Sequence, residues 1–178
     1  MYSHLIADSC SLILLVKCNI LEVLVKHLNV VIPEAVLKET TNERIALKHP
    51  DAALISQYVF KEKIKVATVN GQNHMLNIPF PSSLGAGERE VLLLSRQQEN
   101  SVVATDDGKA IRICKYFGIP FIISPKIVSE LCRLDKIDDE KAKTAIQKLR
   151  IIGRYSPDII AEAIYQLEEI KRVKADNR

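Results

Sequence analysis

Short apolar segments and amphipathic helical segments alternate along most of this chain. Five segments have the length and composition of β-strands: HLIA, NVVI, KIKVATV, VVA and PFII. Between consecutive strands, apolar residues recur with the 3.6-residue period of a helix. Because strands that alternate with helices form a parallel sheet with helices on both faces, the alternation predicts an α/β protein with a mostly parallel sheet.

The pattern changes after residue 137. Two amphipathic helical segments, joined at GRYSP, follow there without another strand. We expect them to form a helical hairpin, so that residues 1–135 make up an α/β domain and residues 136–178 a C-terminal helical extension. The apolar stripe of the hairpin predicts that it packs on the α/β core or on a second subunit, which favours a homodimer.

The composition excludes several classes of protein. Hydrophobic residues make up 47% of the chain and charged residues 26%, which is typical of a folded globular protein and not of a disordered one. The four cysteines form no CxxC pair and have no histidine at zinc-ligand spacing, so we expect reduced thiols. No apolar run is long enough to span a membrane and no secretion signal is evident, which predicts a cytoplasmic protein. The net charge of +3 permits a polyanionic partner.

Acidic residues stand at the ends of two predicted strands. Asp8 follows HLIA, and Asp106 and Asp107 follow the strand VVA after one threonine. Parallel sheets bind ligands at the carboxyl ends of their strands, near the point where the strand order reverses. Two glutamates on predicted helices join these aspartates: Glu39 shares the inward face of PEAVLKET, and Glu88 lies in the first turn of GAGEREVLLL.

Each acid also has a purely structural interpretation. Asp8 and one of the Asp106–Asp107 pair can cap the helices that follow, Glu39 can reach solvent, and Glu88 can complement a helix dipole. Gathered at one sheet edge, however, the five carboxylates would repel one another unless a cation offsets the repulsion. Oxygen ligands without His or Cys favour Mg²⁺ or Mn²⁺, and such a site suits phosphodiester hydrolysis. No Ser–His–Asp or Cys–His arrangement, P-loop or GxGxxG turn offers a competing site.

In order and spacing, four segments resemble the PIN domain family, which comprises metal-dependent nucleases and includes the VapC-type toxins of toxin–antitoxin pairs. These segments are IADSCSLILLVKCNILEVL, VIPEAVLKE, LGAGEREVLLLS and VVATDDGKAIRIC, and LRIIGRYSPDIIAEAI is similar to the extra helical segment of one prokaryotic branch. The resemblance implies a three-layer α/β/α sandwich around a short parallel sheet, with a C-terminal helical hairpin in addition.

The resemblance also implies roles for particular residues. The implied catalytic set is Asp8, Glu39, Glu88, Asp106 and Asp107, with Mg²⁺ or Mn²⁺ held by Asp8, Glu88 and the Asp106–Asp107 pair and with Glu39 as a further acid. The family pattern Thr-x-Asp favours Asp107 as the direct ligand, although Asp106 lies closer to the strand end. Many members have Asp at the position of Glu88. Ser9 and Thr105 match hydroxyl positions that support the acids, and we predict that they bind substrate together with Lys109 and Arg112.

Two hypotheses of function follow. The first is a metal-dependent endoribonuclease that acts on RNA, either as a toxin with an antitoxin protein as its partner or as an RNA-processing enzyme. The second is a PIN-like module that binds protein or RNA and cleaves nothing. A phosphatase of the haloacid dehalogenase class is disfavoured, because it needs Asp-x-Asp where this chain has DSC. In a nuclease the acids should approach a common point, whereas in a binding module they should be splayed or paired with Lys and Arg.

Overall fold

The computed structural model describes residues 2–41, 50–70 and 80–176. The described strands are β1 (His4–Ala7), β2 (Asn29–Pro33), β3 (Ile64–Ala67), β4 (Ser101–Ala104) and β5 (Phe121–Ile122). The described helices are α1 (Ser9–Lys17), α2 (Leu21–His27), α3 (Glu34–Thr41), α5 (Pro50–Phe60), α6 (Ala86–Gln97), α7 (Gly108–Phe117), α8 (Ser124–Arg133), α9 (Asp139–Ile152) and α10 (Pro157–Asp176). The segment 70–83 is rich in Asn, Pro and Ser, which predicts a loop, and its residues 71–79 lie outside the described residues.

All five described strands are parallel, in the order β3-β2-β1-β4-β5. The central strand β1 pairs with β2 on one side and with β4 on the other. Its residues Leu5, Ile6 and Ala7 are buried, as expected for a strand covered on both faces. The strand order reverses between β1 and β4, which is where a ligand is expected in a sheet of this kind.

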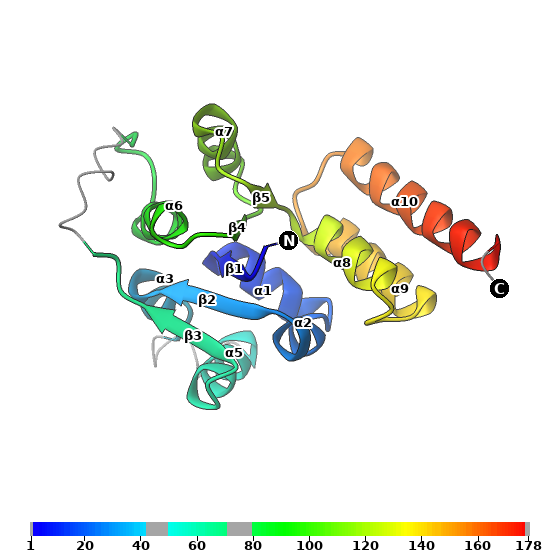
Figure 1. Cartoon of the computed structure of the whole chain (residues 1–178), viewed down its shortest axis with the longest axis horizontal. Helices are drawn as coiled ribbons and strands as arrows, with labels where there is room; N and C mark the ends of the chain where they lie inside the picture. Colours follow the sequence, from blue (N-terminus) through cyan, green and yellow to red (C-terminus); the bar gives the residue numbers. More distant parts are fainter. Residues whose placement is uncertain (1, 42–49, 71–79, 177–178) are drawn as a thin grey trace.

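Helices cover both faces of this sheet (Figure 1). From β1 the chain moves outward to β2 and β3 in one direction, and it then crosses to β4 and β5 in the other. Because such crossovers are right-handed, the two directions place their helices on opposite faces. Accordingly, α1 and α5 pack together on one face, while α6 and α7 lie on the other. The predicted three-layer α/β/α sandwich is confirmed.

The two C-terminal helices form the predicted hairpin. Both α9 and α10 pack against α8, and α10 is the outermost of the three (Figure 1). Apolar residues of the hairpin belong to the same hydrophobic core as the sheet: Ala142, Ala145, Ile146, Leu149, Ile160, Ala163 and Leu167. The hairpin thus packs on the α/β core, while the division into domains at residues 135 and 136 stays a prediction. No helix in the described part of the chain is both long and apolar enough for a membrane span.

The helix that follows β4 has the bounds that its sequence predicts. It runs from Gly108 to Phe117, and Gly118 ends it in the left-handed region at φ 62°. By contrast, the helix α8 has no capping bond from the Ser124 side chain, although serine before proline is a common cap. Its N-cap residue is Ile123, and Ser124 makes hydrogen bonds to the candidate site instead.

Candidate active site

Two neighbouring strands deliver aspartates to the same edge of the sheet. Asp8 follows β1 directly, and Asp106 follows β4 after Thr105. The Asp8 backbone N–H donates to the Ala104 carbonyl at 3.1 Å, which extends the pairing of the two strands by one step. The predicted acids of the strand ends therefore meet at the point where the strand order reverses.

Asp8 both caps a helix and lies in the site. Its Oδ1 accepts a hydrogen bond from the Ser11 backbone N–H at 2.8 Å at the start of α1, and its Oδ2 accepts one from Thr105 Oγ1 at 2.5 Å. The residue is 3% exposed. The pKa of Asp8 is raised to about 6, chiefly by burial and to a smaller extent by the charge of Asp106, against the opposing effect of the hydrogen bonds from Ser11 and Thr105. A nearby cation would offset this cost of holding Asp8 ionised.

Asp106 accepts four hydrogen bonds, two at each oxygen. Its Oδ1 accepts from the Ser124 backbone N–H at 2.9 Å and from the Tyr155 hydroxyl at 2.6 Å. Its Oδ2 accepts from Ser11 Oγ at 2.9 Å and from Ser124 Oγ at 2.5 Å. These four donors fill the lone-pair capacity of a carboxylate. Asp106 thus connects β4 to α1, to the first turn of α8 and to the segment between α9 and α10.

The bond from Tyr155 is that of a neutral phenol. Burial raises the pKa of Tyr155, and its hydrogen bond to the charged Asp106 raises it further. The hydroxyl therefore keeps its proton and remains a donor. Ser11, Ser124 and Tyr155 were not predicted as site residues, because no local pattern identifies them: they lie 95, 18 and 49 positions from Asp106.

Asp107 is the N-cap residue of α7. Its Oδ1 accepts from the backbone N–H groups of Lys109 at 2.8 Å and Ala110 at 2.9 Å. The Asp107 N–H donates to Thr105 Oγ1 at 3.2 Å, so one threonine hydroxyl connects Asp107 with Asp8. Within the described ranges, Oδ2 of Asp107 accepts no hydrogen bond. Of the two adjacent aspartates, only Asp107 therefore keeps an oxygen without a donor.

The two glutamates lie against two glycines of the α6 start. Glu39 is exposed and accepts hydrogen bonds from Ser9 Oγ and from the Gly87 backbone N–H, the latter at 3.0 Å. A Cβ atom on Gly87 would stand 2.6–2.9 Å from the Glu39 carboxylate, and one on Gly85 would stand 2.1 Å from Oε2 of Glu88. Each glycine thus leaves the space that one carboxylate occupies.

The charges of the candidate site act on the Cys10 thiol. Partial burial and, to a smaller extent, the charges of Asp8, Asp106, Asp107 and Glu88 together raise the pKa of Cys10 to about 12. The charges of these four carboxylates therefore all act on the same thiol. None of the salt bridges among the described residues involves any of them or Glu39. Among the same residues, no three His, Cys, Asp or Glu side chains converge as ligands of one metal ion.

The predicted substrate-binding residues fall into two pairs. Ser9 donates to Glu39, and Thr105, which is fully buried, donates to Asp8, so both hydroxyls support acids of the site. Lys109 and Arg112 are exposed on α7. The side chains of the second pair thus face solvent, and the role of all four residues in binding substrate stays a prediction.

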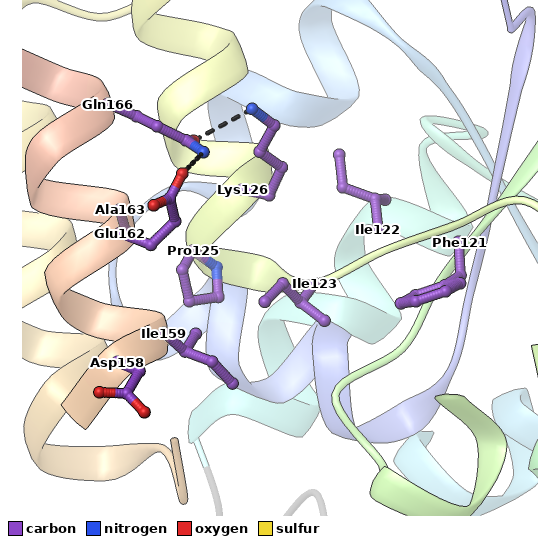
Figure 2. Close-up of a pocket in the computed structure, with 10 residues that line it drawn as sticks. All are labelled: Phe121, Ile122, Ile123, Pro125, Lys126, Asp158, Ile159, Glu162, Ala163 and Gln166. Carbon is purple, nitrogen blue, oxygen red and sulfur yellow. Dashed lines mark hydrogen bonds between the residues drawn. The ribbon is translucent and has the colours of Figure 1, made fainter. Parts of the chain in front are cut away.

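A pocket of about 520 Å³ lies outside the carboxylate site (Figure 2). It is formed by β5, the start of α8 and the first turns of α10, and Lys126 Nζ crosses one side of it to donate to Gln166 Oε1 at 3.0 Å. Its walls include Ile123 and Pro125, which flank Ser124, but none of the five predicted acids. The pocket is therefore separate from the site that carries the charge.

Comparison with known proteins gives one match. A family model described as a PIN domain matches residues 4–169, which is well over half of the chain. A search of the curated proteins finds no match. The match agrees with the parallel sheet and its flanking helices, and PIN domains generally have a nuclease-type fold. This chain therefore belongs to the PIN domain family.

Proposed function

We propose that this protein is a metal-dependent endoribonuclease that hydrolyses phosphodiester bonds of RNA with Mg²⁺ or Mn²⁺. The observation that carries the proposal is that Asp8 and the Asp106–Asp107 pair follow two neighbouring strands at the reversal of the strand order. None of these carboxylates forms a salt bridge with a described residue. A second candidate, a PIN-like module that binds without cleaving, is favoured by the absence of a converged metal-ligand set in the described ranges.

The donor chemistry of the site fits a hard divalent cation. The candidate ligands offer only carboxylate oxygens, which Mg²⁺ and Mn²⁺ prefer. We assign direct binding to Asp8, Glu88 and Asp107, because Asp107 keeps an oxygen without a donor while all four acceptor positions of Asp106 are taken. When bound, the metal lowers the pKa of a water molecule and neutralises charge on the leaving oxygen. Ser11 and Thr105 hold the buried Asp8 in place for this role.

Asp107→Asn is expected to reduce RNA cleavage more than about tenfold, beyond about 1.4 kcal/mol of transition-state stabilisation. Asparagine remains a good helix cap, so the fold is retained while the charge is lost. The assay uses structured and unstructured RNA with and without Mn²⁺. Glu34→Gln is the matched control, because Glu34 is an exposed acid outside the site that bonds Thr68 Oγ1 at 2.9 Å. Wild-type protein that cleaves no RNA in Mn²⁺ would favour the binding module.

Addition of Mg²⁺ or Mn²⁺ is expected to raise the melting temperature. A ligand that binds only the folded state stabilises it by mass action, by about 2.7 kcal/mol at 100 times the dissociation constant. Differential scanning calorimetry in EDTA and in millimolar metal measures the shift, and Asp8→Asn should remove it. A melting temperature that is the same in both conditions would contradict metal binding.

Gly87→Ala is expected to raise the Mn²⁺ concentration needed for half-maximal cleavage. The new methyl group would stand within 2.9 Å of the Glu39 carboxylate, which must then move and give up its bond from the Gly87 N–H. Gly108→Ala is the control at another helix start, since a Cβ there meets nothing within 4 Å. Identical metal dependence in both variants would show that Glu39 has no part in the site.

The finer roles are part of the same proposal. We assign the enzyme to the cytoplasm and to the toxin component of a toxin–antitoxin pair, with an antitoxin protein as its partner. Growth arrest on expression, relieved by Asp107→Asn, tests the toxin role.

The exposed Ile151, Tyr165 and Val173 of the C-terminal hairpin support a homodimer. Light scattering at high concentration tests it, and a monomer there would contradict it.

A further inference from the structure

A second pocket, of about 510 Å³, lies along the outer face of α7. One of its walls consists of Lys109, Arg112, Ile113, Tyr116 and Phe117, which share a helix face because they are three or four residues apart. The opposite wall comes from residues 81–84. The volume lies in the range of about 300–1,000 Å³ that is usual for sites of small ligands, and it is large enough for one nucleotide.

This pocket borders the carboxylate site. The α7 wall begins two residues after Asp107, whose Oδ1 accepts from the Lys109 backbone N–H. Lys109 Nζ reaches across to the opposite wall and donates to the Ser83 carbonyl at 3.3 Å. That wall continues into Gly85, where the Glu88 carboxylate lies. A polymer in the site would therefore meet this pocket next.

The end of the pocket nearer the acids is positively charged. Lys109 and Arg112 are exposed, and neither takes part in a salt bridge within the described part of the chain. Their charge is therefore available to an anion. The neighbouring carboxylates repel phosphate groups, whereas Lys109 and Arg112 attract them. The two cations therefore determine where a nucleic-acid backbone can lie.

The far end of the pocket is aromatic. Tyr116 is 84% exposed, yet its ring is not isolated: its centroid lies 4.9 Å from that of Phe117, with the two planes at 87°. Phe117 in turn meets Phe80 at 6.5 Å and packs against the core. Tyr116 is thus backed by a fixed aromatic pair, while most of its surface faces solvent. Along a helix, the distance from Asp107 to Tyr116 is about 13 Å.

We propose that this pocket binds one nucleotide of single-stranded RNA, with its base stacked on Tyr116 and its phosphate held by Lys109 and Arg112. The inference rests on the proposed nuclease function and adds to it a subsite for one unpaired base. An aromatic ring can stack with an unpaired base, whereas a base inside a duplex cannot reach it. Tyr116 is then a specificity residue and no part of the reacting set.

The test measures the binding of a fluorescent single-stranded oligoribonucleotide by anisotropy in EDTA, where no metal supports cleavage. Tyr116→Ala should weaken binding about 5- to 150-fold, which is the range found for loss of one stacked base. Tyr116→Trp should restore it. Phe60→Ala is the matched control, because Phe60 is also an exposed aromatic residue, at 88%, but lies at the end of α5. Arg112→Gln should weaken binding and flatten its salt dependence.

In the presence of Mn²⁺, Tyr116→Ala should raise KM for single-stranded RNA and leave kcat unchanged. Equal affinities of the wild type and Tyr116→Ala, or a wild type that binds no RNA, would overturn the subsite and leave the ring as a contact for a protein partner. These readouts are separate from the nuclease proposal. A protein that binds RNA through Tyr116 but cleaves none would retain the subsite and lose the enzyme.

Discussion

Asp8→Asn will make the metal-free protein more stable and will reduce RNA cleavage by more than about 100-fold. In the wild type, burial raises the pKa of Asp8 from its ordinary 3.8 to about 6. That rise corresponds to at most about 3 kcal/mol of folding free energy lost when the carboxylate is ionised. Asparagine keeps the acceptor for the Ser11 N–H, can donate to Thr105 Oγ1, and carries no charge. We expect a gain of about 1–3 kcal/mol above pH 7.

The pH dependence identifies the cause of that gain. Because the pKa of Asp8 is higher in the folded state, that state binds the proton more tightly between about pH 4 and pH 6. The contribution of Asp8 to stability is therefore complete below about pH 4 and is lost as the pH rises through about 6. Urea unfolding in EDTA at several pH values should show this decline in the wild type and its absence in Asp8→Asn. Parallel profiles for the two proteins would contradict the assignment.

Asp106→Ala will lower the free energy of unfolding by about 2–4 kcal/mol, because hydrogen bonds to a charged group are worth more than neutral ones. The change removes the acceptor of four donors and leaves Ser11, Ser124 and Tyr155 without it. It also uncaps α8, whose Ser124 backbone N–H donates to Asp106 Oδ1. Loss of these contacts should loosen the C-terminal hairpin as well.

Asp107→Ala is the matched control for this prediction. It removes only a helix cap and should cost about 1 kcal/mol. Chemical denaturation measures both variants, and hydrogen exchange locates the loosened amides in α8 and in the segment around Tyr155. We therefore propose that the two neighbouring aspartates divide their roles, with Asp106 stabilising the fold and Asp107 supporting the reaction. Equal losses of stability in the two variants would contradict that division.

Local patterns predicted much of this fold. Strand ends, the bounds of α7 and the left-handed Gly118 follow from the apolar period and from residue preferences that act within a few positions. For Asp8, a helix cap and a residue of the site were treated as alternatives. In the structure Asp8 caps α1 and also accepts a hydrogen bond from Thr105 within the candidate site. A strand end and a helix start share one edge of the sheet, so a carboxylate there can cap the helix and still accept a hydrogen bond from the neighbouring strand end.

The sequence did not predict how the acids are held. Ser124 has the local pattern of a helix cap, yet its hydroxyl bonds Asp106. Tyr155 lies in a loop between two helices and gives no signal, since its role depends on a fold that brings residues 49 positions apart together. Likewise, Gly85 and Gly87 indicate in the sequence that another group comes close to the backbone there. Only the structure identifies these groups as the carboxylates of Glu88 and Glu39.

The contacts of Asp8 and Asp106 can form only in a fixed order while the chain is being synthesised. A chain made from its N-terminus presents β1 first, but the Thr105 that bonds Asp8 follows 97 positions later, and the Tyr155 that completes the contacts of Asp106 follows 49 positions after that aspartate. Until β4 is made, Asp8 follows a strand that lacks its neighbour on one side. A nascent chain therefore cannot complete the contacts of Asp106 before Tyr155 has left the ribosome. Up to that point the candidate site stays unfinished next to the messenger RNA that is being translated.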